Sequence, residues 1–373
     1  MRGALDNRQL MDLFMAQAVP LIGVFELTSR CNLRCAMCYV GDGEGDLDAS
    51  EWIRLLTQAR DAGMLFAVLT GGEPLLHPDF DRILRHAAQL GVRLVLNTNG
   101  TTLTSDVVTL LQANPPAEVQ VSLYAASDAV SERTTGSASA WRRALEGVDR
   151  LIAAGLRVSM RTTLVAANVE DLEGMWSEVA QRGLVLAWTD YVSPMRANST
   201  TCMELEGVEG RLSPTQYRSV MERLAAWHER DFPDSVANMR KDVGMHLDYL
   251  LHARSQEAEA ESGSHAFTCH AGHVAFAVRH DGVLLPCILC REPVVDLTGI
   301  DVAEGWRLLR QACRDMPVNE DCEGCELASR CHHCPARTQL ENGRNAGCPA
   351  YMRAIAGARV GSGDIRQDMG EAQ

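Results

Sequence analysis

The stretch LIGVFELTSRCNLRCAMC, residues 21–38, joins an apolar run to three closely spaced cysteines. The run has the length and composition of a buried strand, and Cys31, Cys35 and Cys38 follow where that strand would end. A zinc site or a complete iron–sulfur cubane usually takes four protein ligands, so this stretch supplies one too few. What completes the set decides between a structural metal and a reactive one.

Further apolar runs follow the first, and each is separated from the next by an amphipathic stretch. They lie at residues 65–74, 92–100, 117–125, 156–165 and 184–192. Several of the stretches between them begin with a Ser or Asp cap and end at Gly, as helices do. Strands that alternate with helices predict an α/β fold with a parallel sheet and right-handed crossovers. Six such units are too few for a closed eight-stranded barrel, so we expect a partial (β/α)6 barrel of the TIM type.

The polar features of the chain fall where these strands end. Cys31 follows the first run, GGEP (71–74) ends the second, and NTNG (97–100) ends the third. In barrels of this type the chemistry lies at the carboxyl ends of the strands. The motifs and the expected topology therefore agree on one site.

Composition limits the class of protein. The chain is 46% hydrophobic and 23% charged, as ordinary globular proteins are, and its net charge of −14 with no basic cluster argues against nucleic-acid binding. Asp6 and Asp12 interrupt the start, where a signal peptide needs an apolar run, and no apolar run is long enough to span a membrane. We expect a cytoplasmic protein, in which 13 reduced cysteines indicate bound metal.

Most of the cysteines lie in the last third of the chain, where 9 of them follow residue 265. This is the composition of a small domain stabilised by metal. Before it, two predicted helices and a polar tail form a connector. The predicted organisation is a helical lead-in, the barrel, the connector, the cysteine-rich domain and a flexible tail, at 1–20, 21–195, 196–264, 265–355 and 356–373.

The cysteine spacing, the sequence GGEP and the repeated strand–helix units together resemble the radical S-adenosylmethionine (SAM) superfamily. In that family three cysteines bind three irons of a [4Fe–4S] cluster, and SAM itself occupies the fourth iron. The resemblance implies that Cys31, Cys35 and Cys38 hold this cluster. It also implies reductive cleavage of SAM to a 5′-deoxyadenosyl radical that abstracts hydrogen from a C–H bond, with electrons from a flavodoxin or ferredoxin type of protein.

The same resemblance assigns residues to SAM. The family's GGE motif, whose loop holds the SAM ammonium, is matched by Gly71, Gly72 and Glu73. Ser122 ends the fourth run, where relatives place a polar residue on the ribose, and Arg133 matches an arginine that pairs with the SAM carboxylate. Asn99, at the third strand end, is expected to line the site. Taken alone, each of these residues also has a purely structural explanation.

The C-terminal cysteines resemble the SPASM extension of radical SAM enzymes, which holds two auxiliary [4Fe–4S] clusters. By that pattern one cluster is held by Cys322, Cys325, Cys331 and Cys348. The other is held by Cys269, Cys287 and Cys334. For its fourth ligand Cys290 is the first choice, with Cys313 or an open iron as alternatives. A pair of zinc sites is the competing interpretation of these spacings, and three clusters with SAM are the expected cofactors.

Most SPASM enzymes modify peptides or proteins, so we expect crosslinking or oxidation of a ribosomally made peptide. Ile288 stands where sulfatase-maturing relatives have an Asp, which argues against that activity. Only about 20 residues precede the first strand, so a peptide substrate would need a separate recognition protein or none. The alternatives are a small-molecule enzyme of the haem or haem d1 type and, outside catalysis, a metal-binding scaffold.

Overall fold

The computed structural model describes residues 13–40, 43, 45–192, 210–232, 266–267, 269–328, 330–331 and 334–359. Most of the predicted lead-in, much of the connector and nearly all of the tail lie outside the described residues. Within the connector, the first predicted helix is present as α8 (Pro214–Asp231), which begins at a Ser213 capping box.

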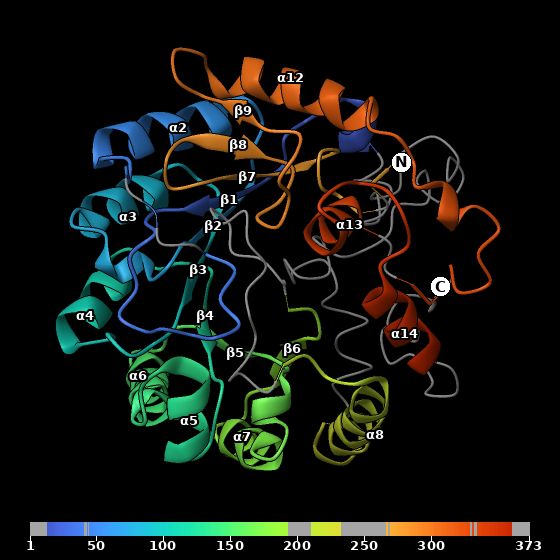
Figure 1. Cartoon of the computed structure of the whole chain (residues 1–373). Helices are drawn as coiled ribbons and strands as arrows, with labels where there is room; N and C mark the ends of the chain where they lie inside the picture. Colours follow the sequence, from blue (N-terminus) through green and yellow to red (C-terminus); the bar gives the residue numbers. More distant parts are fainter. Residues whose placement is uncertain are drawn as a thin grey trace, which may run out of the picture.

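The barrel sheet follows the apolar runs of the sequence, and the predicted strands are confirmed. They are β1 (Ile22–Glu26), β2 (Phe66–Thr70), β3 (Arg93–Thr98), β4 (Glu118–Ser122), β5 (Val158–Thr163) and β6 (Leu186–Thr189). Each pairs in parallel with the next, in spatial order from β1 to β6. Such a curved, open parallel sheet is the partial barrel that the sequence predicts (Figure 1).

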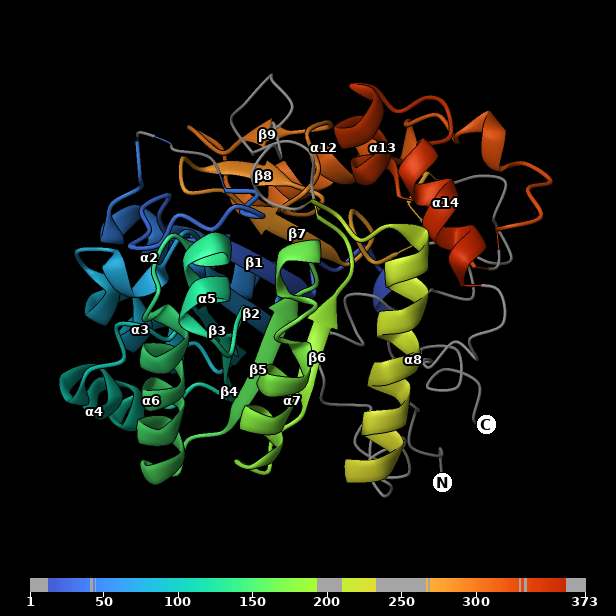
Figure 2. The ribbon, with the colours of Figure 1, turned by 60° about the horizontal axis from the view of Figure 1, so that its bottom comes forward.

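Helices between these strands cover the outer face of the sheet, as Figure 1 and Figure 2 show. They are α2 (Ala49–Asp61), α3 (Phe80–Gln89), α4 (Ser105–Ala113), α5 (Asp128–Thr135), α6 (Ala140–Ala153) and α7 (Leu172–Ala180). Polar caps start several of them: the Asp48 carboxylate accepts from the backbone N–H groups of Ser50 and Glu51 at the start of α2. The sequence predicts all of these helices except α5.

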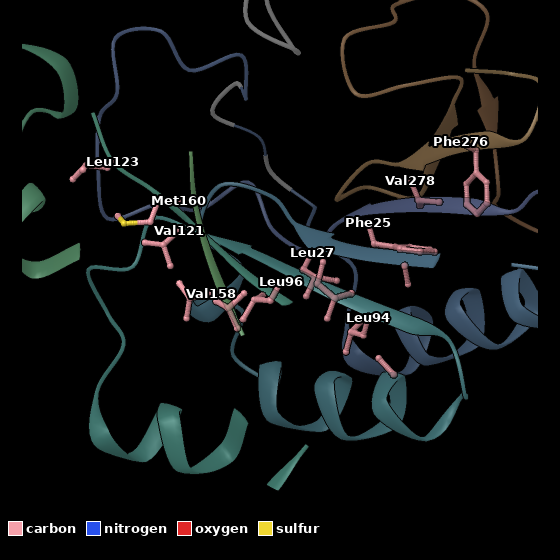
Figure 3. Close-up of a cluster of buried hydrophobic side chains, with 14 of the residues drawn as sticks. Phe25, Leu27, Leu94, Leu96, Val121, Leu123, Val158, Met160, Phe276 and Val278 are labelled. Atoms are coloured by element: carbon pink, nitrogen blue, oxygen red, sulfur yellow. The ribbon is translucent and has the colours of Figure 1, made fainter. Parts of the chain in front are cut away.

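Strand alternation separates the two faces of the sheet. Figure 3 shows Phe25, Leu96 and Met160 among the buried apolar side chains that pack between the strands and the helices. Because successive side chains on a strand point to opposite faces, the residues next to these in sequence face the barrel interior. The apolar core thus lies outside the strands, which leaves the inner face available for chemistry.

The cysteine-rich region extends the same sheet. Its first strand, β7 (Ala275–Val278), pairs in parallel with β1, and the antiparallel strands β8 (Val283–Leu285) and β9 (Val295–Asp296) follow at the edge. Phe276 on β7 meets Phe25 edge to face with the ring centroids 5.9 Å apart. The sequence predicts a small domain held by metal, but this part of it also shares the barrel's apolar core.

Three further helices complete the C-terminal region: α12 (Val302–Arg314), α13 (Pro335–Asn342) and α14 (Ala350–Ala358). The indole N–H of Trp306 on α12 donates to the Ala18 carbonyl at 2.6 Å, which ties this helix to the start of the described chain. α14 packs beside α8 (Figure 2). Among the described residues, no helix has the length and apolar character needed to cross a membrane.

Candidate active site

Three cysteines lie together in the loop that leaves the carboxyl end of β1. Cys31, Cys35 and Cys38 are each partly exposed. Burial raises the pKa of the Cys35 thiol far above its ordinary value, and negative charge on Cys38 and Cys31 raises that pKa further. Thiols whose charges raise one another's pKa lie close together in space. As thiolates they need a positive partner, which the irons of a cluster would supply, so the donor set fits such a group.

The GGE motif supports this loop through its backbone. The Gly72 N–H donates to the Thr28 carbonyl at 2.7 Å, and the Glu73 N–H donates to the Arg30 carbonyl at 2.8 Å. A Cβ atom on Gly71 would lie 2.5 Å from the Thr28 oxygen, and one on Gly72 would lie 2.3 Å from the Arg30 oxygen. Both glycines are therefore required for the second strand end to lie directly against the cysteine loop.

The Glu73 side chain is fully buried and is bound by its own chain. Its carboxylate accepts from the Thr98 hydroxyl at 2.7 Å, from the Asn99 backbone N–H at 2.7 Å and from the Leu75 N–H at 3.2 Å. Burial raises the pKa of Glu73 to about 7, against the lowering effect of these hydrogen bonds. The carboxylate thus fixes the end of β3 against the GGE turn.

Asn99 connects the buried Glu73 carboxylate to the cysteine loop. Its side-chain amide donates to the Cys31 sulfur at 3.7 Å and to the Asn32 oxygen at 2.9 Å. Its own oxygen accepts from the Thr101 backbone N–H at 2.9 Å. Asn99 therefore reaches the cysteine loop, and its amide is oriented by contacts on both sides.

A small cavity lies beside the loop. It is partly open to solvent, and the residues that line it include Leu33, Asn99, Ser122, Tyr124 and Trp141. The structure thus brings Ser122 and Asn99, which are more than 20 positions apart in sequence, to one cavity next to Cys31. This is the arrangement that a polar ligand docked against the cysteines would require.

Arg133 is placed differently from these residues. It lies on α5, is 39% exposed, and forms an ion pair with Glu170. It is not among the residues that line the cavity. The structure therefore does not bring Arg133 together with Asn99 and Ser122 in this conformation.

Helix α5 itself supports the site, although sequence analysis does not anticipate it. The backbone N–H groups of Arg34 and Ala36 donate to the carbonyls of Thr135 and Thr134 at 2.9 and 3.0 Å. The last turn of α5 therefore binds the cysteine loop directly. Nothing in the local sequence signals a contact of this kind between distant segments.

Asp46 joins the cysteine loop to the C-terminal region. Its carboxylate accepts from the Ser29 N–H at 2.9 Å and the Thr28 hydroxyl at 2.5 Å, and it lies 3.3 Å from the buried His280 ring. His280 sits in the turn between β7 and β8. The sequence does not predict this link either, because an acidic residue in a glycine-rich loop is no specific signal.

The first C-terminal cysteine group collects five thiols. Burial raises the pKa of Cys269 to about 12, and negative charge on Cys334 adds to the shift. Burial also raises the pKa of Cys287, and negative charge on Cys334 and Cys269 raises it further. The pKa of Cys290 is raised by burial and by the charges of Cys287, Cys334 and Cys313. The predicted set of Cys269, Cys287 and Cys334 is brought together, with Cys290 and Cys313 both beside it.

The second C-terminal group contains the other four predicted cysteines. Burial raises the pKa of Cys322 to about 11, and the charges of Cys331, Cys348 and Cys325 raise it further. The Cys348 backbone N–H donates to the Asp321 carboxylate at 2.7 Å, which holds the last cysteine beside the first. The fold thus brings Cys348 close to Cys322, although the two are far apart in sequence.

Within the described part of the chain, no three His, Cys, Asp or Glu side chains converge closely enough to hold a single metal ion. A polynuclear cluster needs no such convergence, because each cysteine binds a different iron.

Comparison with known proteins gives matches over the barrel and over the whole chain. The family model described as the radical SAM superfamily matches residues 25–176. The AdoMet-dependent heme synthase of Methanosarcina barkeri is 24% identical over 338 residues, which cover 87% of this chain and 93% of that protein. The PqqA peptide cyclase of Streptomyces rochei is 33% identical over 159 residues, and the match spans 42% of this chain and 43% of the cyclase.

Solved structures show the same fold. Streptococcus suis SuiB bound to S-adenosylmethionine superposes with a TM-score of 0.67 at 16% identity, covering 95% of this chain and 84% of SuiB. The anSMEcpe structure with bound AdoMet also gives 0.67, at 12% identity, covering 91% of this chain and 96% of that one.

Proposed function

We propose that this chain, whose residues 25–176 match the radical SAM superfamily, uses reductive cleavage of SAM to modify a ribosomally made peptide. The observation that carries this proposal is the cysteine loop: three neighbouring thiols, no fourth cysteine beside them among the described residues, and a cavity next to Cys31 to which Asn99 and Ser122 contribute. SAM would complete the set of ligands that the chain begins.

Cys31, Cys35 and Cys38 would hold the cluster at which SAM is cleaved. Such a cluster, when bound, supplies the electron that splits the sulfonium bond and releases the 5′-deoxyadenosyl radical. The chain's own residues orient the loop that holds it: Asn99 donates to the Cys31 sulfur, and the Gly71–Gly72 backbone lies against the strand end that precedes the cysteines.

The remaining cofactor residues are proposed on the same grounds. Asn99 and Ser122 line the cavity and would contact SAM, and the GGE turn would present its backbone to the SAM ammonium. Because Arg133 is paired with Glu170 at the surface, it would have to exchange that partner to reach a SAM carboxylate. A primary alkyl radical such as 5′-deoxyadenosyl attacks almost any nearby C–H bond, so these contacts would also serve to hold it in line with one target hydrogen and to exclude water.

Two auxiliary [4Fe–4S] clusters would lie in the C-terminal region, for a total of three. The second group, Cys322, Cys325, Cys331 and Cys348, offers a complete set of four thiols. Support for the first group comes from the closeness of Cys269, Cys287 and Cys334. These clusters would exchange an electron with the substrate, and a flavodoxin or ferredoxin type of reductant would deliver electrons from outside.

Cys290 is the proposed fourth ligand of the first auxiliary cluster. Its thiol donates to the Glu292 carbonyl at 3.1 Å and to the Gln339 side-chain oxygen at 3.8 Å, and it lies beside Cys287 and Cys334, so it would exchange these two contacts for iron. Replacing Cys290 with Ser should change the Mössbauer parameters of one iron, whereas the matched variant Cys313→Ser should leave them as they are. The reverse result would assign the ligand to Cys313.

The peptide substrate is supported by the similarity to PqqA peptide cyclase, which has the highest identity of the relatives above. A tetrapyrrole or other small molecule is the second candidate, because the match to the heme synthase extends over almost the whole of that protein.

The first experiment asks whether SAM is cleaved at all. Protein reconstituted anaerobically with iron and sulfide is mixed with SAM and dithionite, and 5′-deoxyadenosine is measured by chromatography. We expect 5′-deoxyadenosine from the wild type and none from the Cys31→Ala variant. Absence of the product from wild-type protein that contains its iron would contradict the proposed function and favour a metal-binding scaffold.

A further inference from the structure

A continuous row of polar side chains crosses the inner wall of the barrel. At one level of the sheet, each strand from β7 to β5 contributes one polar residue: Arg279, Glu26, Thr70, Asn97, Gln120 and Ser159. We call this row the polar belt. The register pairs Glu26 with Thr70, Asn97 with Gln120, and Gln120 with Ser159. Phe25 pairs with Val278 and Leu69 pairs with Leu96. Continuing each register by one residue places Arg279 beside Glu26 and Asn97 beside Thr70.

The belt faces the interior. Its neighbours along the strands, such as Phe25, Leu96 and Val121, are the apolar side chains that pack toward the helices in Figure 3. Alternation along a strand therefore turns the belt to the opposite face. One level below, the wall is apolar across four strands, where Ala277, Val24, Val68 and Val95 pair in register.

One level above the belt lie the residues beside the cysteine loop. Ser122 comes two positions after Gln120, and Asn99 comes two positions after Asn97. Two residues of strand advance about 6.6 Å, so the belt lies that far below the proposed SAM site. A substrate held by the belt would thus be within the barrel, directly beneath the bond that is cleaved.

Several belt atoms are buried without a hydrogen-bond partner among the described residues. They are the Glu26 Oε1, the Asn97 Oδ1 and the Ser159 Oγ. Glu26 is only 2% exposed, and its carboxylate accepts a hydrogen bond from the Tyr39 hydroxyl. A buried polar atom left unpaired costs about 1–3 kcal/mol, so these positions are poor choices for stability alone. They are what a site for a polar ligand requires.

We propose that the polar belt binds the backbone of a peptide substrate, with Glu26 accepting a hydrogen bond from one of its N–H groups. This inference rests on the proposed function, and it names the residues that would select a peptide. An extended peptide presents N–H and C=O groups in alternation, and the belt offers hydroxyl, amide and carboxylate groups side by side. Adjacent belt residues are about 4.8 Å apart and an extended chain advances about 3.4 Å per residue, so the belt spans several residues of such a peptide.

A tetrapyrrole matches this wall less well. Its apolar ring would face a row of hydrogen-bonding groups, and its carboxylates would need guanidinium partners. Two arginines of the described wall lie at the belt or one level above it, and both are already engaged. Arg279 binds the Asp281 carboxylate through two hydrogen bonds, and Arg161, which pairs with Ser122 above the belt, donates to the Gln120 oxygen at 3.2 Å. The charges therefore favour a neutral, amide-rich ligand.

The test uses the full-length, anaerobically reconstituted protein immobilised on a resin. A pool of short random peptides is applied, retained peptides are counted by mass spectrometry, and iron coproporphyrin III is applied in a parallel arm. We expect the wild type to retain peptides and the Asn97→Leu/Ser159→Ala variant to retain about tenfold less, from the loss of two hydrogen-bonding groups. The matched control is Glu118→Gln, since Glu118 is also buried but lies one level below the belt.

Thermal unfolding of the ligand-free protein separates binding from a structural role. Removing unpartnered atoms should raise the Tm of Asn97→Leu/Ser159→Ala, whereas a structural role predicts a lower Tm and would overturn the proposal. Should that variant fail to fold, Glu26→Gln, which keeps the side-chain shape, takes its place in the peptide arm and must also retain less.

Equal retention of peptides by the wild type and the belt variants would overturn the proposal that the belt binds a peptide. Wild-type protein that retains iron coproporphyrin III but no peptide would overturn it as well. Failure of the proposed function is seen separately, as absence of 5′-deoxyadenosine from wild-type protein with SAM and dithionite.

Discussion

The cysteine loop after β1 and the cysteine groups of the C-terminal region solve the same problem in opposite ways. The loop offers three thiols and is held by the fold: by the GGE backbone, by the last turn of α5 and by Asp46. The second C-terminal group offers four thiols on short segments with little regular structure between them. One region has a rigid frame and an incomplete ligand set, whereas the other has a complete set and a sparse frame.

This difference indicates what each metal site is for. A site that must admit an exchangeable ligand cannot depend on that ligand for its shape, so its frame comes from packed strands and buried hydrogen bonds. A site that is closed by the protein can contribute folding free energy through the metal itself. We therefore expect the two regions to respond differently to the loss of thiols, iron and backbone space.

The largest expected effect follows from removing the loop's thiols. In the variant Cys31→Ala/Cys35→Ala/Cys38→Ala, 5′-deoxyadenosine formation should fall more than about 100-fold, because no iron remains for SAM. Iron analysis should still find about eight of about twelve irons, held by the C-terminal groups. If the triple variant still cleaves SAM, the assignment of the site is wrong.

The next effect concerns stability in the C-terminal region. Replacing Cys325 with Ala should release about four irons and open the segment 319–328 to limited proteolysis, since no residue of this segment belongs to the apolar core and metal would hold it instead. The barrel, with its own apolar core, should stay resistant. Equal proteolysis of both regions would remove the distinction between a frame made by the fold and one made by metal.

A smaller effect is expected from crowding the backbone contact at the loop. Gly72→Ala places a methyl group 2.3 Å from the Arg30 carbonyl, so the loop must shift, at about 1–3 kcal/mol of unfolding free energy and with loss of iron from the loop. Gly357→Ala is the control, because nothing lies within 4 Å of its Cβ position in α14. It should be neutral or stabilising by about 1 kcal/mol.

The last effect is a pH dependence of stability, which disappears at low pH. Burial raises the pKa of Glu26 to about 7, while the Tyr39 hydroxyl and the Arg279 charge oppose this and Asp281 adds to it. Because the folded pKa is raised, Glu26 contributes stability below its unfolded pKa and loses it as pH rises toward 7. Glu26→Gln should therefore stabilise the protein at pH 8 by on the order of 3 kcal/mol, and by nothing near pH 4. A constant difference across this range would show that burial of the charge is not the cause.

The sequence predicts the barrel well, because each strand is a compact apolar run followed by a polar strand end. Cys31, Glu73 and Asn99 lie at successive strand ends, so topology alone brings them together. The contact between α5 and the loop, the pairing of β7 with β1 and the Asp46–His280 link join segments that are distant in sequence. No local pattern encodes such contacts. Arg133 illustrates the same limit, since a motif match does not reveal that the side chain is paired with Glu170.

The most direct test of the account is electron paramagnetic resonance of the reduced protein before and after addition of SAM. We predict that the signal of the loop cluster changes on addition of SAM, and that the signals remaining in the Cys31→Ala/Cys35→Ala/Cys38→Ala variant do not. No change in the wild type, or an equal change in the variant, would contradict the claim that the loop after β1 leaves an iron for SAM.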